Sequence, residues 1–153
     1  MTSKKAAKSQ PASKAPKLED LKPIDRSSLL KQIHATMPLP IREEVGADGS
    51  LVYVGGDPGE VVVRIAQGRM TVSVFGTECE GSDTPMVSPQ TLVKLQWTYL
   101  PAGLLTRLLP EIIEVARQIR LAKYCKCEHC GETKPPEWMH ENGICQSCDQ
   151  HNA

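Results

Sequence analysis

The sequence predicts an α+β fold, with a small, mainly antiparallel four-stranded sheet, a short N-terminal helix, a long C-terminal helix and a cysteine-rich module after it. Three observations support this prediction. Short β-branched runs separated by turn residues fill the middle of the chain, one long segment repeats apolar residues at helical spacing, and five of the six cysteines lie between positions 125 and 148. With one Phe, two Trp and three Tyr among 153 residues, the core must consist mainly of Val, Leu and Ile.

Residues 1–25 predict a disordered tail rich in Lys, Pro and Ser, because they contain almost nothing whose burial could offset the entropy cost of ordering the chain. The tail carries five lysines before its first acidic residue: Lys4, Lys5, Lys8, Lys14 and Lys17. A nucleic-acid-binding arm would use such lysines to contact phosphates. We favour a solubilising tail, since five dispersed lysines are fewer than a dense basic patch supplies.

Residues 26–123 are expected to form the α+β domain, which opens with a short helix over 25–37. Three apolar residues of this segment fall on one helical face: Leu29, Leu30 and Ile33. Asp25 or Ser27 can accept hydrogen bonds from the free first-turn amides. Prolines at positions 38 and 40 then end the helix, because neither can donate a hydrogen bond.

Three short β-branched runs follow the first helix, and turn residues divide them: 51–54, 61–66 and 70–75. An antiparallel meander is the simplest way to pair them. Residues 92–99 alternate again and predict a fourth strand. A helix over the same segment is the alternative, since Ser88 and Pro89 would suit a helix start.

The segment 104–124 predicts the long helix. Apolar residues recur in it at steps of three and four, at Leu108, Ile112, Val115 and Ile119. The charged residues Glu114, Arg117 and Arg120 fall outside that stripe and are expected to face solvent. Pro110 leaves two alternatives: a kinked helix, or a separate first turn with Pro110 opening the main helix.

The C-terminal cysteines form two Cys-x2-Cys pairs, Cys127 with Cys130 and Cys145 with Cys148, separated by residues 131–144. Each pair can hold one edge of a tetrahedral ion, so this spacing predicts one zinc ion bound by four cysteines. Catalytic zinc keeps one position open for water, whereas four thiolates close the site. We therefore expect a structural zinc ion that supplies folding energy to a segment with few residues to bury.

Three nearby residues are alternative ligands. Cys125 could replace Cys127 or stay free, but the glycine at position 131 favours the knuckle that begins at Cys127. His129 and His140 could also bind metal, although four sulfurs already complete the tetrahedron. We expect all three residues to lie outside the site.

The cysteine segment 127–148 resembles the zinc fingers of GATA type and, more broadly, treble-clef and zinc-ribbon modules. The likeness rests on CEHCGETKPPEWM and NGICQSC, in which a Cys-x2-Cys-Gly knuckle precedes a Thr-x-Pro-x-Trp-like segment and a second knuckle. The resemblance implies a four-cysteine zinc ribbon over 124–153, with the four paired cysteines as ligands and Trp138 packed beside the site. Basic residues that follow the tryptophan in the DNA-binding family are replaced here by Met139 and His140.

Trp138 and Met139 have two interpretations in such a small module: they cover the metal site, which we favour, or they offer an apolar anchor to a partner. Elsewhere, Cys79 is expected to be an ordinary loop thiol, because His34 is the one histidine that precedes the cysteine segment and nothing places it near Cys79. Glu78, Glu80 and Asp83 predict a solvated acidic loop rather than a calcium site.

These observations predict a non-enzymatic, zinc-binding protein that acts in protein–protein interaction or as an adaptor. The alternative is a regulatory protein that binds nucleic acid through the lysine-rich tail and the zinc module. The 18 basic and 18 acidic residues balance, so the whole chain has no field that attracts nucleic acid or anionic lipid. No apolar run suggests a signal peptide or a membrane span, so we expect a cytoplasmic, intracellular protein.

Overall fold

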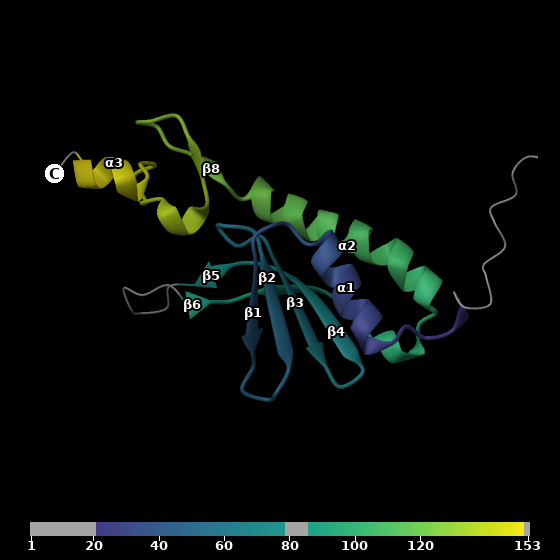
Figure 1. Ribbon diagram of the computed structural model, residues 1–153. Helices are drawn as coiled ribbons and strands as arrows, with labels where there is room; N and C mark the ends of the chain where they lie inside the picture. Colours follow the sequence, from purple (N-terminus) through teal and green to yellow (C-terminus); the bar gives the residue numbers. More distant parts are fainter. Residues whose placement is uncertain (1–20, 79–85, 152–153) are drawn as a thin grey trace, which may run out of the picture.

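The computed structural model describes residues 21–78 and 86–151, and its centre is an antiparallel sheet with the strand order β1-β2-β3-β4-β7 (Figure 1). The strands are β1 (Ile41–Val45), β2 (Leu51–Gly55), β3 (Val61–Ala66), β4 (Arg69–Val74) and β7 (Gln90–Leu95). The α+β class and the antiparallel pairing are confirmed, but the expected number of four strands was wrong. The missed strand is β1, an edge strand with the sequence IREEV, whose charged residues hide any apolar alternation.

The uncertain segment 92–99 is a strand in its first part only. It belongs to β7 as far as Leu95, and Trp97–Tyr99 then form the 3-10 helix η2, which leads into the long helix. The strands β5 (Thr77–Glu78) and β6 (Met86–Val87), of two residues each, pair with one another in the connection between β4 and β7. The expectations for the N-terminal lysines and for Cys79, Glu80 and Asp83 concern positions outside the described residues.

The short and the long helix both agree with the sequence in position, although not in detail. Helix α1 (Arg26–Thr36) begins at Asp25, whose carboxylate accepts a hydrogen bond from the Ser28 amide at 2.8 Å. Helix α2 (Ala102–Ala122) passes through Pro110 as one element. Of the two alternatives left open for Pro110, a separate first turn is therefore wrong.

The apolar stripe expected on α2 is displaced by one position. The buried face consists of Leu105, Leu109, Ile113, Ala116 and Arg120. Val115, which was expected to face the core, is 47% exposed. Two adjacent faces of α2 are apolar in sequence, and packing against the sheet selects the one that is buried. Arg120 was expected to face solvent and instead ends the buried stripe.

The main core lies between the sheet and the two helices. Alternate residues of the central strands point toward α1 and α2, among them Tyr53, Val63, Val72 and Met70. A smaller cluster of Val54, Val62 and Phe75 lies on the opposite face of the sheet. No helix in the described part of the chain combines the length and the apolarity that crossing a membrane requires.

A small module follows α2 directly and lies beyond the C-terminal end of that helix (Figure 1). It contains the hairpin β8 (Cys125–Lys126) with β9 (Thr133–Lys134), the 3-10 helix η3 (Pro136–Trp138) and the short helix α3 (Gln146–His151). The module thus combines a short hairpin with short helical segments.

Candidate metal centre

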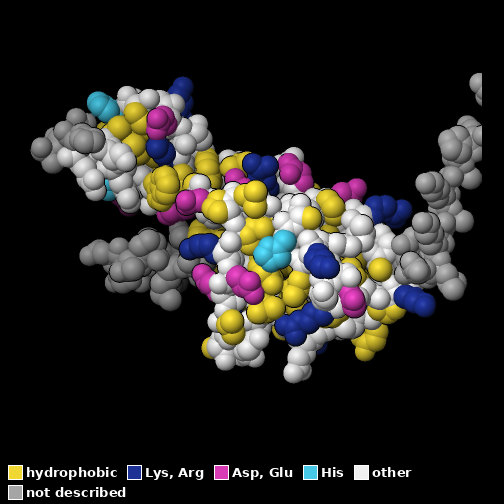
Figure 2. Space-filling model, viewed as in Figure 1, with side chains coloured by type: hydrophobic (Ala, Val, Ile, Leu, Met, Phe, Trp, Pro, Cys, Tyr) yellow, Lys and Arg dark blue, Asp and Glu magenta, His cyan; other side chains and the backbone are white. Residues whose placement is uncertain are grey.

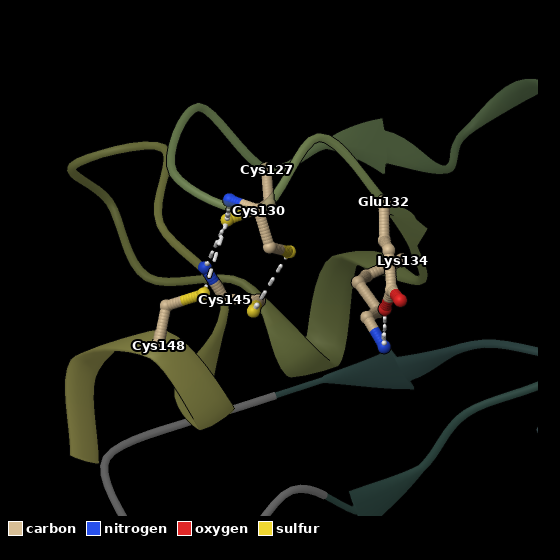
Figure 3. Close-up of polar contacts among 6 residues, drawn as sticks. All are labelled: Cys127, Cys130, Glu132, Lys134, Cys145 and Cys148. Carbon is tan, nitrogen blue, oxygen red and sulfur yellow. Dashed lines mark hydrogen bonds and ion pairs between the residues drawn. The ribbon is translucent and has the colours of Figure 1, made fainter. Parts of the chain in front are cut away.

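Four cysteine sulfurs converge inside the C-terminal module (Figure 3). Cys127 and Cys130 lie in the loop between β8 and β9, Cys145 immediately precedes α3, and Cys148 lies on that helix. All four Sγ atoms lie within 4.8 Å of one another. The structure therefore brings together the four residues that the sequence singled out as metal ligands.

The sulfur spacing fits a tetrahedral metal ion. The Sγ atoms of Cys127 and Cys148 are 3.8 Å apart, and those of Cys130 and Cys145 are 3.9 Å apart. A zinc–sulfur bond of about 2.3 Å gives a tetrahedron whose edges measure about 3.8 Å. A disulfide would require about 2.05 Å between the sulfurs. Thiolate ligands in this arrangement suit zinc and other thiophilic ions.

Backbone amides surround the Cys127 sulfur. The amide of Cys145 donates to Cys127 Sγ at 3.3 Å and the amide of Cys130 at 3.5 Å. These backbone donors, that of Cys130 first, lower the pKa of the Cys127 thiol to about 6. Burial raises the pKa of the Cys148 thiol to about 12, so this cysteine loses its proton only where a metal ion favours the thiolate.

Two glycines shape the turns that present the cysteines. Gly131 (φ 75°) closes the first knuckle by donating from its amide to the Cys127 carbonyl at 2.9 Å. Gly143 (φ 81°) precedes the second knuckle, and its carbonyl accepts from the Glu128 amide at 3.0 Å. Because only glycine adopts these φ values at little cost, the local sequence encodes both turns.

The apolar residues around the thiols differ from the expectation. Met139 and Ile144 pack against the buried cysteines, whereas Trp138, expected to cover the site, is 42% exposed. The ammonium of Lys134 lies 5.9 Å from the centre of the Trp138 ring. Trp138 also borders a cavity of about 260 Å³ together with Lys134, Gln146 and Ser147. Met139 covers the metal site, and Trp138 faces partly outward.

The alternative ligands lie outside the sulfur cluster. Cys125 is exposed on β8, and His129 is also exposed. The Nε2 atom of His140 lies 3.4 Å from a carboxylate oxygen of Asp149. Among the described residues, the cluster with metal-binding spacing consists of the four paired cysteines.

The module is acidic, apart from any charge that the thiolates add. Residues 124–151 contain two lysines, Lys126 and Lys134, against five acidic residues: Glu128, Glu132, Glu137, Glu141 and Asp149. Lys134 is paired with Glu132, whose carboxylate lies 2.7 Å from the ammonium (Figure 3). This charge does not favour phosphate contacts.

Glu137 is the residue of the module that sequence reasoning missed. It lies on η3, and its side chain turns inward to pair with Arg120 of α2. Nothing in the local sequence distinguishes Glu137 from the other acidic residues of the module. A signal for Arg120 does exist, because it follows the buried Ala116 by about one helical turn and so lies on the same face of α2.

No protein-family model, curated protein or solved structure matches this chain. The functional assignment therefore rests on the geometry of the fold and of the sulfur cluster.

Proposed function

We propose that the C-terminal module binds one structural zinc ion through Cys127, Cys130, Cys145 and Cys148, and that the protein is a non-enzymatic interaction or adaptor protein built around this zinc scaffold. The observation that carries the proposal is the spacing of the four sulfurs, 3.8 Å between Cys127 and Cys148 and 3.9 Å between Cys130 and Cys145. Four thiolates at these positions complete the tetrahedral coordination of zinc.

The scaffold role follows from the composition of the module. Its buried hydrophobic cluster consists of three cysteines, with Met139 and Ile144 packed against them. Such a small cluster supplies little hydrophobic free energy, so the metal must provide much of the stability. A closed four-sulfur site also leaves no coordination position for a substrate or a catalytic water molecule.

Trp138 is the proposed contact residue. It combines a half-exposed aromatic ring, the Lys134 ammonium nearby and an adjacent cavity of about 260 Å³. Tryptophan beside a small pocket is a frequent energetic centre of protein–protein interfaces. Cys145 borders the same cavity, so metal binding would hold the pocket in shape.

The test compares the wild-type protein with Trp138→Ala and Tyr99→Ala. Tyr99 is a strongly exposed aromatic residue on η2, outside the module, and therefore serves as the matched control. Partners recovered with wild-type protein are identified, purified and titrated against each variant. Loss of affinity in W138A, at unchanged zinc content, with retained affinity in Y99A supports the proposal; equal affinity of all three proteins contradicts it.

Nucleic-acid binding by the lysine-rich tail remains the competing proposal, and the same proteins can test it. Fluorescence anisotropy with mixed-sequence DNA and RNA at low and near-physiological salt measures phosphate binding directly. Binding that persists at physiological salt and disappears on removal of residues 1–22 would favour this alternative, because phosphate contacts depend steeply on salt.

A further inference from the structure

A polar cleft of about 810 Å³ lies at one end of the main sheet. The turn between β1 and β2, the turn between β3 and β4, the start of α1 and η2 form its walls, and the two turns lie side by side at the lower end of the strands in Figure 1. The turn between β2 and β3 lies at the other end of the sheet, where Gly59 contacts α2 near the zinc module. The cleft is thus separate from the metal centre.

Two arginines give this cleft a positive charge. Arg26 is the first residue of α1, and Arg69 is the first residue of β4. Both side chains are exposed, and neither forms an ion pair within residues 21–78 and 86–151. Figure 2 shows Lys and Arg side chains at this end of the molecule. Two unpaired guanidinium groups that line one cleft favour an anion there.

The acidic group in the cleft is already neutralised. Asp48 lies 2.9 Å from the guanidinium of Arg64, and its carboxylate accepts hydrogen bonds from the hydroxyl and the amide of Ser50 at 2.6 and 3.1 Å. Arg64 also donates to the Ser50 hydroxyl at 2.8 Å. Asp48 therefore does not cancel the charge of Arg26 and Arg69.

We propose that this cleft binds a small organic anion, a phosphate ester or a carboxylate, with Arg26 and Arg69 as its charge partners. Guanidinium groups form paired hydrogen bonds with both kinds of anion. The volume of about 810 Å³ accommodates a ligand of nucleotide or smaller size. This site is independent of the interaction proposed for Trp138.

The experiment titrates the full-length, zinc-loaded protein with pyrophosphate and, separately, with citrate by isothermal titration calorimetry at low salt. We expect saturable 1:1 binding of at least one probe, with a Kd of about 1 mM or tighter. Arg26→Gln and Arg69→Gln should each weaken this binding about tenfold, which corresponds to one lost charged contact. Binding of pyrophosphate alone identifies a ligand with a phosphate group, and binding of citrate alone identifies a carboxylate.

Arg107→Gln is the matched control, because Arg107 is an exposed arginine of α2 that does not line the cleft. The absence of saturable binding of both probes would overturn the proposal. Equal weakening by R107Q and R69Q would overturn it as well, since it would indicate a general effect of net charge.

Discussion

Arg120 of α2 and Glu137 of η3 form a buried ion pair that joins the cysteine-rich module to the sheet and helices before it. The side chains are 2% and 8% exposed, respectively. Arg120 also donates from Nε to the Gly59 carbonyl at 2.9 Å and lies 5.1 Å from the ring centres of both Phe75 and Tyr124. One guanidinium group thus contacts the turn between β2 and β3, the residues that follow β4 and α2, and the module.

The environment of Arg120 depends on close packing around Gly59. A Cβ atom at this position would lie 2.6 Å from the Phe75 ring, so only glycine lets the ring approach the loop. The buried Tyr124 hydroxyl and the second carboxylate oxygen of Glu137 have no partner among the described residues. Apart from Glu137, none of these groups carries a negative charge that could balance Arg120.

Glu137→Ala should lower the free energy of unfolding by about 3 kcal/mol, because it leaves the Arg120 charge buried without a counterion. Urea unfolding of the zinc-loaded protein measures this loss. Glu141→Gln, which removes an exposed charge of the same module, is the control and should change stability by less than about 0.5 kcal/mol. Similar stability of E137A and wild type would show that the two parts are not held together by this pair.

The purified protein should contain one zinc ion per chain. Cys145→Ser removes a ligand and a buried sulfur of the cluster, so this variant should lose the metal, whereas Cys125→Ser should retain it. Metal analysis by inductively coupled plasma mass spectrometry gives the stoichiometry directly. Retention of zinc by both variants would refute the proposed set of ligands.

Zinc should be retained at neutral pH and released on acidification. The pKa of Cys127 is lowered to about 6 from an ordinary value of 9.0. The contribution of its thiolate to the stability of the folded module is therefore complete above pH 9.0 and is still partly present at neutral pH. This contribution is lost as the pH falls through about 6, and protons then compete with the metal for all four sulfurs. A colorimetric zinc assay along a pH series tests this, and full retention of zinc at pH 4, well below that pKa, would be contrary to it.

Leu109→Ala and Val115→Ala compare the two apolar faces of α2. Leu109 is fully buried, so its truncation should cost about 2–5 kcal/mol. Val115 is half exposed, and V115A should be close to neutral because alanine also favours the helix. Thermal unfolding distinguishes the two variants, and a larger loss in V115A would mean that α2 is rotated relative to the structure.

The features predicted correctly depend on short stretches of sequence. Two Cys-x2-Cys pairs and the glycines at positions 131 and 143 encode the knuckles locally, and β-branched runs between turn residues encode β2, β3 and β4. The helix cap at Asp25 is equally local, since its carboxylate bonds an amide three residues away. Each of these signals is complete within a few neighbouring residues.

The features that were missed depend on contacts between distant parts of the chain. Strand β1 carries no apolar alternation and is defined by its pairing with β2. The buried face of α2 is selected by the sheet, and Arg120 is buried because Gly59, Phe75 and Glu137 surround it. The sequence by itself determined the α+β class and the four-cysteine knuckles. Tertiary packing decided the buried face of α2, the outward position of Trp138 and the ion pair that holds the module. The reason is that burial depends on the neighbours that the fold assembles and not on any one segment.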